Sequence, residues 1–348
     1  MTVVKKLSVE NIRSHSKFVV NLSPTVTVIV GNNGSGKTSL LEAIYIALQG
    51  TSFKGSDNDI LRYKSDWWRI EIEFSNFIKR TITYDPNLTS GRKKIMIDDK
   101  VMYRLPAKDK YPVVLFEPED LRLLNGSPNR RRQFIDRFIS QLDPIYLNAL
   151  HKYDRALKQR NNLLKKQRFL DDELFVWDIA LSQYGAYIIE KRIAFTEQIN
   201  SQINQSYNSI ARSKDDVSVH YSDTYIGDIK QKLLNDLHRS AQRDRLTGFT
   251  SIGPHRHDVI FKFNNFPALD VASRGEVRTI VLALKFIEVS IIQQITNIKP
   301  IILLDDVFSE LDELRQKYLI HSQKRQIIIT STRVNDLFIS KDFKHIKL

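Results

Sequence analysis

A glycine-rich segment near the start of the chain has the residue types of a phosphate-binding loop. It matches the pattern G-x-x-x-x-G-K-[S/T], with an apolar run before it and a helical run after it. Its members are Gly31, Asn32, Asn33, Gly34, Ser35, Gly36, Lys37 and Thr38. Glycines let backbone N–H groups surround a β-phosphate, Lys37 can reach the β- and γ-phosphate oxygens, and the Thr38 hydroxyl can hold Mg²⁺. The segment predicts a nucleoside triphosphate site; the alternative is a glycine-rich turn that happens to contain Lys-Thr.

An acidic pair follows an entirely apolar run late in the chain. The run is Ile301–Leu304, and Asp305 and Asp306 come directly after it. An all-apolar strand is buried in the middle of a sheet, so Asp305 at its carboxyl end is predicted to meet the magnesium ion. Asp306, one residue on, is predicted to polarise the attacking water as a general base. Taken alone, the segment also fits a buried strand that ends in two solvated acids.

A serine and a glycine stand at the start of a long apolar helical run. Ser273-Arg274-Gly275-Glu276 predicts a helix start that can bind an anion, although an ordinary N-cap fits the same residues. The order of features favours the anion site: the phosphate loop comes first, then this helix, then the acidic pair. That order is the arrangement of an ATP-binding-cassette (ABC) ATPase. In that class two protomers sandwich ATP, and the serine helix of one faces the γ-phosphate held by the other.

The elements that must position these residues alternate between strands and helices on both sides of a helical middle. Periodicity predicts strands early in the chain and again after about residue 248. The predicted strands are residues 3–9, 17–22, 26–30, 69–74, 79–84, 94–97, 111–116, 259–263, 301–304 and 326–330. Between them, Asp143-Pro144 marks a helix start, and two long amphipathic helices follow as an antiparallel hairpin. The predicted fold is α/β: an ABC-type phosphate-loop ATPase head, a mixed sheet with flanking helices, with an inserted helical arm. The predicted divisions are residues 1–116, 117–245 and 246–348.

Composition limits the class of protein. The chain has 348 residues, with 53 Lys and Arg against 40 Asp and Glu, for a net charge of +13. This excess favours a polyanionic partner, most often nucleic acid. The absence of cysteine excludes disulfides and thiolate sites and fits a reducing cytoplasm. The first residues lack the apolar segment of a signal peptide, and no stretch is expected to span a membrane.

Most of the basic excess falls in one segment. Eleven Lys and Arg stand against three Asp between residues 129 and 168. Such a face would neutralise DNA phosphates without sequence preference. The preferred contacts are Arg130, Arg131, Arg132, Lys152, Arg155 and Lys158. The alternatives are a solvated helix face and, for the arginine triplet, contacts that dock the arm on the head.

Other residues leave two interpretations open. His255 and His257 form an H-x-H pair, for which a structural loop is favoured over a metal site. Arg13, which follows the first strand, is predicted either to contact the bound nucleotide or to be a surface arginine. Glu117 and Glu119 fall where such ATPases place a loop that senses the γ-phosphate.

The chain resembles the RecF family of SMC-like ATPases nearly from end to end. The resemblance is carried by these segments, in order: LSVENIRSH, GNNGSGKTSLLEAIYIALQG, FEPEDLRLLNGSPNRRRQFIDRFISQLDPIYLNALHKYDRALKQRNNLLK, TSIGPHRHD, ASRGEVRTIVLALK and ILLDDVFSELD. It implies ATP-dependent dimerisation, slow hydrolysis with Mg²⁺, and binding of single-stranded, gapped or junction DNA in gap repair and the SOS response. It also implies recombination-mediator partners such as RecR and RecO.

Two segments depart from the patterns of these ATPases. The family's helix start is often S-Q-G-Q-Q-R, whereas this chain has S-R-G-E-V-R. The region of the late histidine of many cassette ATPases has no histidine, and Thr330 or Thr332 is expected to do part of its work. Asp-Asp, where most cassette ATPases have Asp-Glu, keeps a non-catalytic, ATP-switched DNA-binding scaffold as a rival. A transporter ATPase is a further rival, disfavoured by the basic arm.

Overall fold

The structure, a computed structural model, describes residues 2–166, 171–321, 325–332 and 343–348. The chain forms two compact units. The head unit consists of Met1–Asp120 and Glu288–Leu348, and the helical unit of Leu121–Ile287. The sequence analysis placed the divisions after residues 116 and 245, whereas the compact units divide the chain after residues 120 and 287. The second division differs because the strand Val259–Phe263 pairs with the strand Val217–Tyr221, which contacts the long helix Asp171–Ala211, so this part of the chain belongs to the helical unit.

The head unit contains an antiparallel sheet whose strand order is β2-β1-β4-β5-β6-β7. The strands are β1 (Val4–Ile12), β2 (His15–Asn21), β4 (Trp68–Phe74), β5 (Lys79–Tyr84), β6 (Lys93–Ile97) and β7 (Lys100–Met102). Alternate residues of β4 are buried, as expected for a sheet with one face on the core. All but β7 were predicted, because the alternation of apolar and polar residues identifies such strands.

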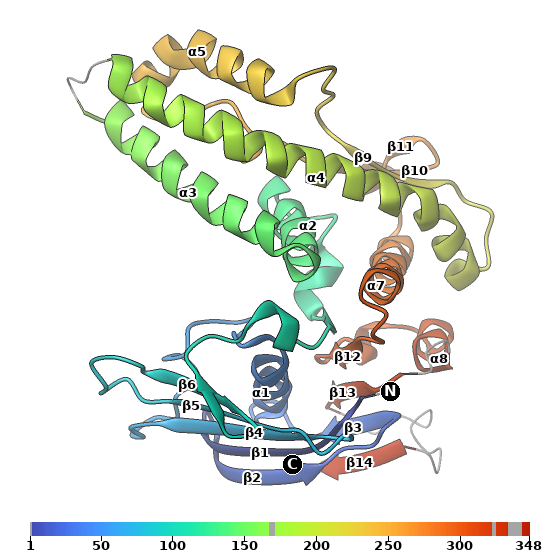
Figure 1. Cartoon of the computed structure of the whole chain (residues 1–348). Helices are drawn as coiled ribbons and strands as arrows, with labels where there is room; N and C mark the ends of the chain where they lie inside the picture. Colours follow the sequence, from blue (N-terminus) through green and yellow to red (C-terminus); the bar gives the residue numbers. More distant parts are fainter. Residues whose placement is uncertain (1, 167–170, 322–324, 333–342) are drawn as a thin grey trace. The chain divides into compact units, whose positions relative to one another are not determined.

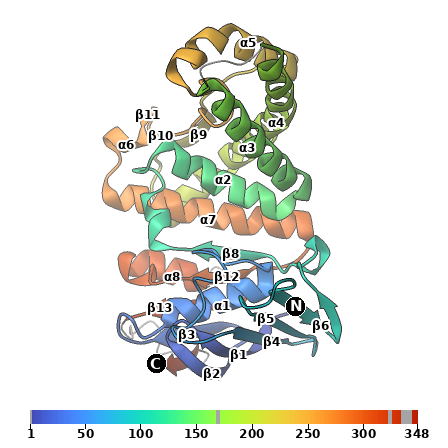
Figure 2. The ribbon, with the colours of Figure 1, turned by 90° about the vertical axis from the view of Figure 1, so that its left-hand side faces the viewer.

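A second, parallel sheet of the head unit has the order β14-β3-β13-β12-β8. Its strands are β14 (Phe343–Lys347), β3 (Val26–Val30), β13 (Ile327–Ser331), β12 (Ile301–Leu304) and β8 (Val113–Phe116). The inner strands are short apolar runs, as parallel strands covered on both faces require. Helix α1 (Lys37–Gln49) contacts strands of both sheets and is buried along nearly its whole length, so both sheets share one core (Figures 1 and 2).

Strand β14 covers the edge of the strand that leads into the phosphate loop. It pairs in parallel with β3 along its whole length. Just beyond it, the Leu348 backbone N–H donates to the Val30 carbonyl at 2.8 Å. This strand was not predicted. The head unit also holds α8 (Glu313–His321) and two short 3₁₀ helices, Ala107–Asp109 and Phe308–Glu310; a third, Pro118–Arg122, crosses the division after residue 120.

The helical unit contains the predicted antiparallel hairpin. Helices α3 (Pro144–Leu164) and α4 (Asp171–Ala211) lie side by side (Figure 1). The start signal is confirmed, because the Asp143 carboxylate accepts from the N–H groups of Ile145 and Tyr146. Helices α2 (Pro128–Leu142) and α5 (Ile229–Thr247) pack on the hairpin. A small sheet and a short helix complete the unit: β9 (Val217–Tyr221), β10 (Val259–Phe263), β11 (Phe266–Pro267) and α6 (Ala268–Val271).

Helix α7 (Arg274–Thr296) is the long apolar helix predicted after Ser273. By length and composition it could cross a membrane, and it is the one such helix among the described residues. However, 67% of its apolar window is buried inside the structure, which is typical of a core helix of a soluble protein.

Candidate nucleotide site

The parallel sheet brings together segments that lie far apart in the sequence. Strand β3 ends at Val30, directly before the phosphate loop, and β12 ends at Leu304, directly before Asp305. Strand β13 lies between them and is paired in parallel with both. Because parallel strands end at the same edge of a sheet, the residues that follow β3, β13 and β12 lie close together.

The glycines of the phosphate loop are required by its backbone. Gly34 and Gly36 have φ angles of 83° and 93°, in the left-handed region that side chains disfavour. A Cβ on Gly36 would also collide with His15 and Ser14. The His15 Nε2 atom lies 3.1 Å from the Gly36 carbonyl oxygen, so the β1–β2 connection closes over the loop. Helix α1 starts at Lys37, and its first N–H groups are available to an anion.

Lys37 is buried within the phosphate loop. Its side chain is 4% exposed, and Nζ donates to the carbonyls of Gly31 at 2.9 Å and Asn32 at 3.2 Å. Nζ also lies 3.7 Å from Asp306 Oδ2. The ammonium group is therefore held in place by the loop, with a carboxylate as its charged partner.

Asp305 joins the two halves of the site. Its Oδ1 accepts from the Thr38 hydroxyl at 2.7 Å and from the Thr330 hydroxyl at 3.0 Å. The side chain is almost fully buried. A hydroxyl and a carboxylate in contact are the protein ligands that Mg²⁺ takes beside the phosphates of a nucleotide, so this donor set fits the ion. The predicted pairing of Thr38 with Asp305 is thus present in the geometry.

Asp306 has an unusual backbone and a perturbed acidity. Its φ is 50°, a left-handed conformation that aspartate tolerates better than most residues. Its N–H donates to the Thr330 hydroxyl at 2.9 Å, which fixes that conformation. Burial raises the pKa of Asp306, with Lys37 opposing the shift and Asp305 adding to it. A carboxyl with a raised pKa is a better proton acceptor than an ordinary aspartate.

Thr330 and Thr332 have different positions. Thr330 is fully buried and touches both aspartates, as described above. Thr332 is exposed at the end of β13. Of the two threonines named as substitutes for the missing histidine, the structure brings only Thr330 into the site. Strand β13 was predicted, but its place between β3 and β12 was not.

The sequence analysis missed Lys54, which contacts the second carboxylate oxygen of Asp305. Lys54 Nζ lies 3.3 Å from Asp305 Oδ2. Arg13 is placed by Glu42 of α1, with Arg13 Nη2 2.8 Å from Glu42 Oε2. Neither an isolated lysine in a loop nor a buried glutamate carries a pattern that sequence alone would single out.

The predicted serine helix forms a capping box. The Ser273 N–H donates to the Glu276 carboxylate at 2.6 Å, and the Glu276 N–H donates to Ser273 Oγ at 3.3 Å. The Gly275 carbonyl accepts from the Thr279 hydroxyl at 2.9 Å. Ser273 is exposed at the start of α7 in the helical unit. These hydrogen bonds are those of an ordinary N-cap. The start of the helix, with Ser273, is exposed.

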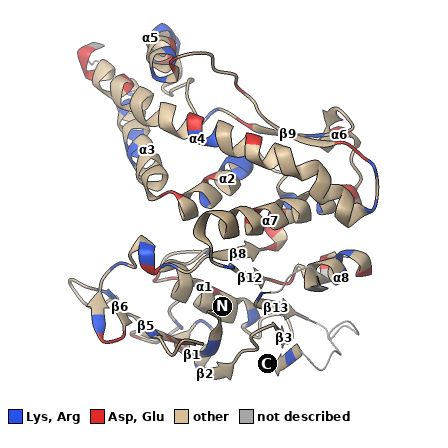
Figure 3. Cartoon of the chain, turned by 45° about the vertical axis from the view of Figure 1, so that its right-hand side comes forward, with Lys and Arg blue, Asp and Glu red and all other residues tan. Residues whose placement is uncertain are grey.

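The predicted DNA-binding residues lie on α2 and α3, both of which carry Lys and Arg (blue in Figure 3), and they fall into two groups by burial. Lys152, Arg155 and Lys158 are exposed along α3. In α2, however, Arg131 is buried: its guanidinium makes two hydrogen bonds to Asp258, at 2.8 and 2.7 Å, and two more to backbone carbonyls. Arg130 and Arg132 are half-buried, and Arg132 donates to the His257 carbonyl at 2.7 Å. A guanidinium committed in this way is not available to phosphates, so Arg131 is a structural residue here.

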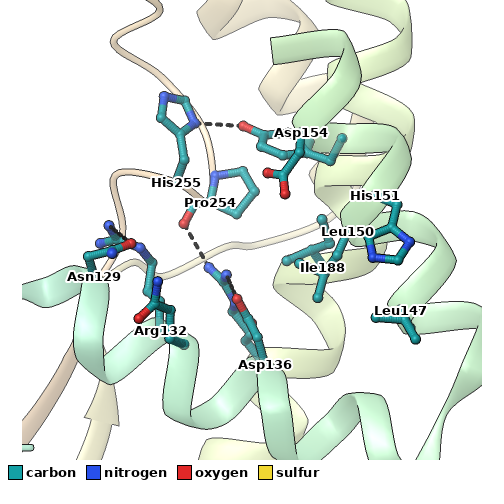
Figure 4. Close-up of a pocket in the computed structure, with 13 residues that line it drawn as sticks. Asn129, Arg132, Asp136, Leu147, Leu150, His151, Asp154, Ile188, Pro254 and His255 are labelled. Carbon is teal, nitrogen blue, oxygen red and sulfur yellow. Dashed lines mark hydrogen bonds and ion pairs between the residues drawn. The ribbon is translucent and has the colours of Figure 1, made fainter. Parts of the chain in front are cut away.

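His255 lines a polar cavity of about 360 Å³ in the helical unit (Figure 4), and His255 and His257 each contact a tyrosine hydroxyl. Tyr153 Oη lies 2.7 Å from His255 Nδ1, and Tyr221 Oη lies 2.9 Å from His257 Nδ1. Burial lowers the pKa of both histidines to about 4. No group of three metal-ligating side chains occurs among the described residues. The arrangement is that of the favoured structural loop.

The two glutamates proposed as a γ-phosphate sensor lie just after β8. The Glu117 N–H donates to the Asp120 carboxylate at 2.9 Å. Glu117 is buried, and Glu119 is exposed in the short 3₁₀ helix that follows. Their part in sensing stays a prediction.

Comparison with known proteins agrees with this fold. Residues 6–346 match the family model described as an AAA domain. The DNA replication and repair protein RecF of Clostridium beijerinckii is 35% identical over 341 residues, which cover 96% of this chain and 93% of that protein. A solved structure of the recombination mediator protein RecF with ATP, in the RecFOR pathway, is 30% identical with a TM-score of 0.84, covering 96% of this chain and 93% of that one.

A more distant likeness concerns the fold alone. The Smc head domain of Pyrococcus furiosus is 18% identical with a TM-score of 0.52, covering 96% of this chain and 90% of that one. The fold and the site together define a phosphate-loop ATPase head of the ABC type, as in SMC proteins. Within that class, the chain belongs to the RecF family.

Proposed function

We propose that this chain is an ATP-dependent DNA-binding protein of recombinational repair and replication, active in gap repair and SOS induction in the cytoplasm. It binds ATP with Mg²⁺ at a dimer interface and hydrolyses it slowly. The observation that carries the proposal is the 2.7 Å contact between the Thr38 hydroxyl and Asp305, residues 267 positions apart, beside the buried Lys37. The family relatives, which are named repair and replication proteins, support the cellular role.

The nucleotide site is completed by a second copy of the chain. Ser273 and the backbone of Gly275 stand at the exposed start of a 23-residue helix, where N–H groups and the helix dipole favour an anion. In the proposed dimer this helix end of one copy meets the γ-phosphate held by Lys37 and Thr38 of the other. A γ-phosphate is needed for that contact, so ATP favours the dimer.

In this proposal, hydrolysis uses Lys37, Thr38, Asp305 and Asp306. Lys37 and the first N–H groups of α1 bind and orient the phosphates, and Asp306 accepts the proton of the attacking water. Mg²⁺, held by Thr38 and Asp305, would neutralise charge on the phosphoryl group. A non-catalytic scaffold is the second candidate, favoured by the pairing of the short Asp306 side chain with Lys37 at 3.7 Å. No observation favours the transporter ATPase.

DNA binding is assigned to the α3 basic face, which we define as Lys152, Arg155 and Lys158, with Arg130 and Arg132 beside it. The three residues of the face are exposed and recur every third position, so they share one side of the helix. Phosphate contacts of this kind bind single-stranded or gapped DNA without sequence preference. RecR and RecO are the proposed protein partners, on the strength of the pathway named for the solved relative.

The test is ATP-driven dimerisation, measured by sedimentation with and without gapped DNA. Lys37→Ala should lose ATP binding about a hundredfold or more, because it removes charge-assisted hydrogen bonds to the phosphates. Ser273→Arg should bind ATP as a monomer but fail to dimerise. A mixture of the two variants retains one intact composite site and should recover heterodimer. Normal ATP-dependent dimerisation of Lys37→Ala, or loss of ATP binding in Ser273→Arg, would contradict the proposal.

A second variant separates the two candidate functions. Asp306→Asn keeps the shape of the side chain but cannot accept a proton. It should bind ATP and dimerise normally, while single-turnover hydrolysis falls. Equal hydrolysis in Asp306→Asn and in the wild-type protein would remove Asp306 from the role of base and favour the scaffold.

A further inference from the structure

The polar cavity of the helical unit takes no part in the nucleotide site (Figure 4). Its lining comes from α2, α3, α4 and the loop before β10. Its volume, about 360 Å³, falls in the range of small-molecule sites, which is about 300–1,000 Å³. The cavity opens to solvent, because several of its lining residues are exposed, among them Gln133, His151 and Asp154.

The part of the lining that comes from α2 and α4 is positively charged. Arg192 is buried and donates twice to Asp136, at 2.9 and 2.8 Å, and once to the Pro254 carbonyl, at 2.7 Å. Arg132 makes one hydrogen bond of 2.7 Å to the His257 carbonyl and one of 3.4 Å to a side chain of its own helix. A guanidinium has five N–H donors, so Arg132 keeps donors for a ligand. Two cations against one carboxylate leave this side positive.

The part of the lining that comes from α3 is acidic. Among the described residues, none makes a hydrogen bond or an ion pair with the Asp154 carboxylate. His151, one turn earlier on α3, lines the same side. Apolar contacts come from Leu147, Leu150 and Ile188. The cavity therefore offers a hydrogen-bond acceptor on one side, donors on the other and an apolar surface.

This combination of groups disfavours a simple ion. The Asp154 carboxylate repels an anion, and the two guanidinium groups repel a cation. A neutral, planar ligand with donors and acceptors on its edges and apolar faces suits both sides. A nucleobase has these properties, and proteins that hold an unstacked base use polar contacts to its edge and apolar or aromatic contacts to its faces.

The cavity borders the α3 basic face. His151 and Asp154, which line the cavity, directly precede Lys152 and Arg155, which belong to the face. Consecutive residues are about 100° apart around a helix axis, so these two sides of α3 adjoin. A strand whose phosphates contact the face would carry its bases past the opening of the cavity. Only an unpaired base could leave that strand and enter.

We propose that the cavity receives one unpaired base of a DNA strand bound along the α3 basic face, with Asp154 accepting a hydrogen bond from the base and Arg132 donating one to it. This proposal rests on the DNA binding of the proposed function and deepens it. Phosphate contacts alone do not distinguish a paired strand from an unpaired one. A base pocket does, so it gives the protein a preference for a gap.

The experiment compares two gapped duplexes that differ only in the gap, where the nucleotides carry bases in one and are abasic in the other. Both have the same phosphates, so the ratio of their affinities isolates the contribution of the bases. Fluorescence anisotropy should show that wild-type protein binds the gap with bases about tenfold more tightly, the size of one base contact.

Two variants remove the proposed pocket in different ways. Asp154→Ala removes the acceptor, and Leu150→Trp fills the cavity from a different position. Both should reduce the tenfold ratio to about one. Both should also keep the wild-type slope of log affinity against log salt, because the phosphate contacts of the α3 basic face are unchanged.

Glu190→Ala is the matched control, since Glu190 is an exposed acid of α4 that does not line the cavity. It removes the same charge as Asp154→Ala and should keep the tenfold ratio. Thermal melting checks that every variant is folded, and Asp154→Ala alone decides if Leu150→Trp does not fold.

Three results would count against these ideas, and they can be told apart. If wild-type protein binds both gapped duplexes equally, the cavity receives no base, although the proposed DNA binding stands. If the ratio in Asp154→Ala stays at the value of Glu190→Ala, the base is bound elsewhere and the inference is wrong. If wild-type protein binds neither duplex, the proposed DNA binding itself fails.

Discussion

Two groups of ion pairs, one in each unit, differ in the burial of their members and in the length of their contacts. In the helical unit, Arg160 is fully buried and donates to Asp178 at 2.6 Å and to Asp244 at 2.7 Å. In the head unit, Lys37 and Lys54 each face one aspartate at more than 3 Å, and one partner of each pair is about one-third exposed. The contacts of Arg160 are short and buried, which fixes its partners. The contacts between the site lysines and the aspartates are longer and partly exposed, so these pairs can change partner.

This difference shows why the net charge of a segment does not by itself identify the residues that bind DNA. Arg131 and Arg160 both belong to the segment with the highest basic density, yet both guanidiniums are buried against carboxylates. The exposed lysines of α3 and Lys54 lack such geometry, whereas Lys37 is buried and also donates to two carbonyls of the phosphate loop. A buried charge that is bonded on several sides stabilises the unit, whereas a charge with one long contact can change partner.

Breaking the buried cluster should have the largest effect on stability. Arg160→Ala leaves Asp178 and Asp244 as uncompensated buried charges, so the free energy of unfolding should fall by about 3–5 kcal/mol. Urea denaturation followed by circular dichroism measures the change. Lys158→Ala, an exposed change two residues away, is the control and should stay within about 0.5 kcal/mol. An equal loss of stability in Arg160→Ala and Lys158→Ala would show that the buried and the exposed charge contribute alike.

Acid should weaken the helical unit by an intermediate amount. Burial lowers the pKa of His255 and His257 to about 4 from 6.5, with nearby arginines adding to the shift and Asp223 opposing it at His257. The unfolded chain therefore binds more protons than the folded one between these values. Stability should be full above pH 6.5 and fall on the order of 1–3 kcal/mol per histidine as the pH falls to 4.

The measurement is the melting temperature of the wild-type protein and of His255→Gln across that pH range. The variant should show a shallower dependence on pH, whatever its absolute stability, because one titrating group has been removed. His238→Gln is the control, since His238 is exposed. A pH slope that is the same in all three proteins would exclude the buried histidines as its source.

The α3 basic face should give the smallest effect on stability and a clear effect on DNA. Replacing Lys152, Arg155 and Lys158 together by alanine should reduce the slope of log affinity against log salt by about 2–3, since each lost phosphate contact removes about 0.9. Fluorescence anisotropy with a gapped duplex, at several salt concentrations, measures the slope. An unchanged slope and affinity would place the DNA contact on another surface.

The sequence predicted the parts of the site that are local. The phosphate loop and the acid after β12 were found because a backbone cradle and a buried strand each leave a continuous signature. The helices of the hairpin were found because their period extends over many turns. The same reasoning missed β14, which has little alternation of burial, and β9, whose alternation extends over only five residues.

The charges could not be assigned from sequence, because their partners lie far away along the chain. Arg131 meets Asp258 across 127 positions, and Lys54 meets Asp305 across 251. A basic residue that is exposed and one that is buried in an ion pair look the same in a composition count. Only the fold, which brings β12 beside the Ser52–Gly55 turn and the loop before β10 beside α2, distinguishes them.

Leu348, which follows β14, has a practical consequence for anyone who labels this protein. Its backbone is bonded to Val30, and its Cβ would lie 3.1 Å from a Cβ placed on Gly31. A bulky label attached at Leu348 would therefore lie close to the phosphate loop. The same proximity makes the position a good place for a reporter. Since the chain contains no cysteine, a single Leu348→Cys substitution would accept one fluorophore whose emission responds directly to nucleotide.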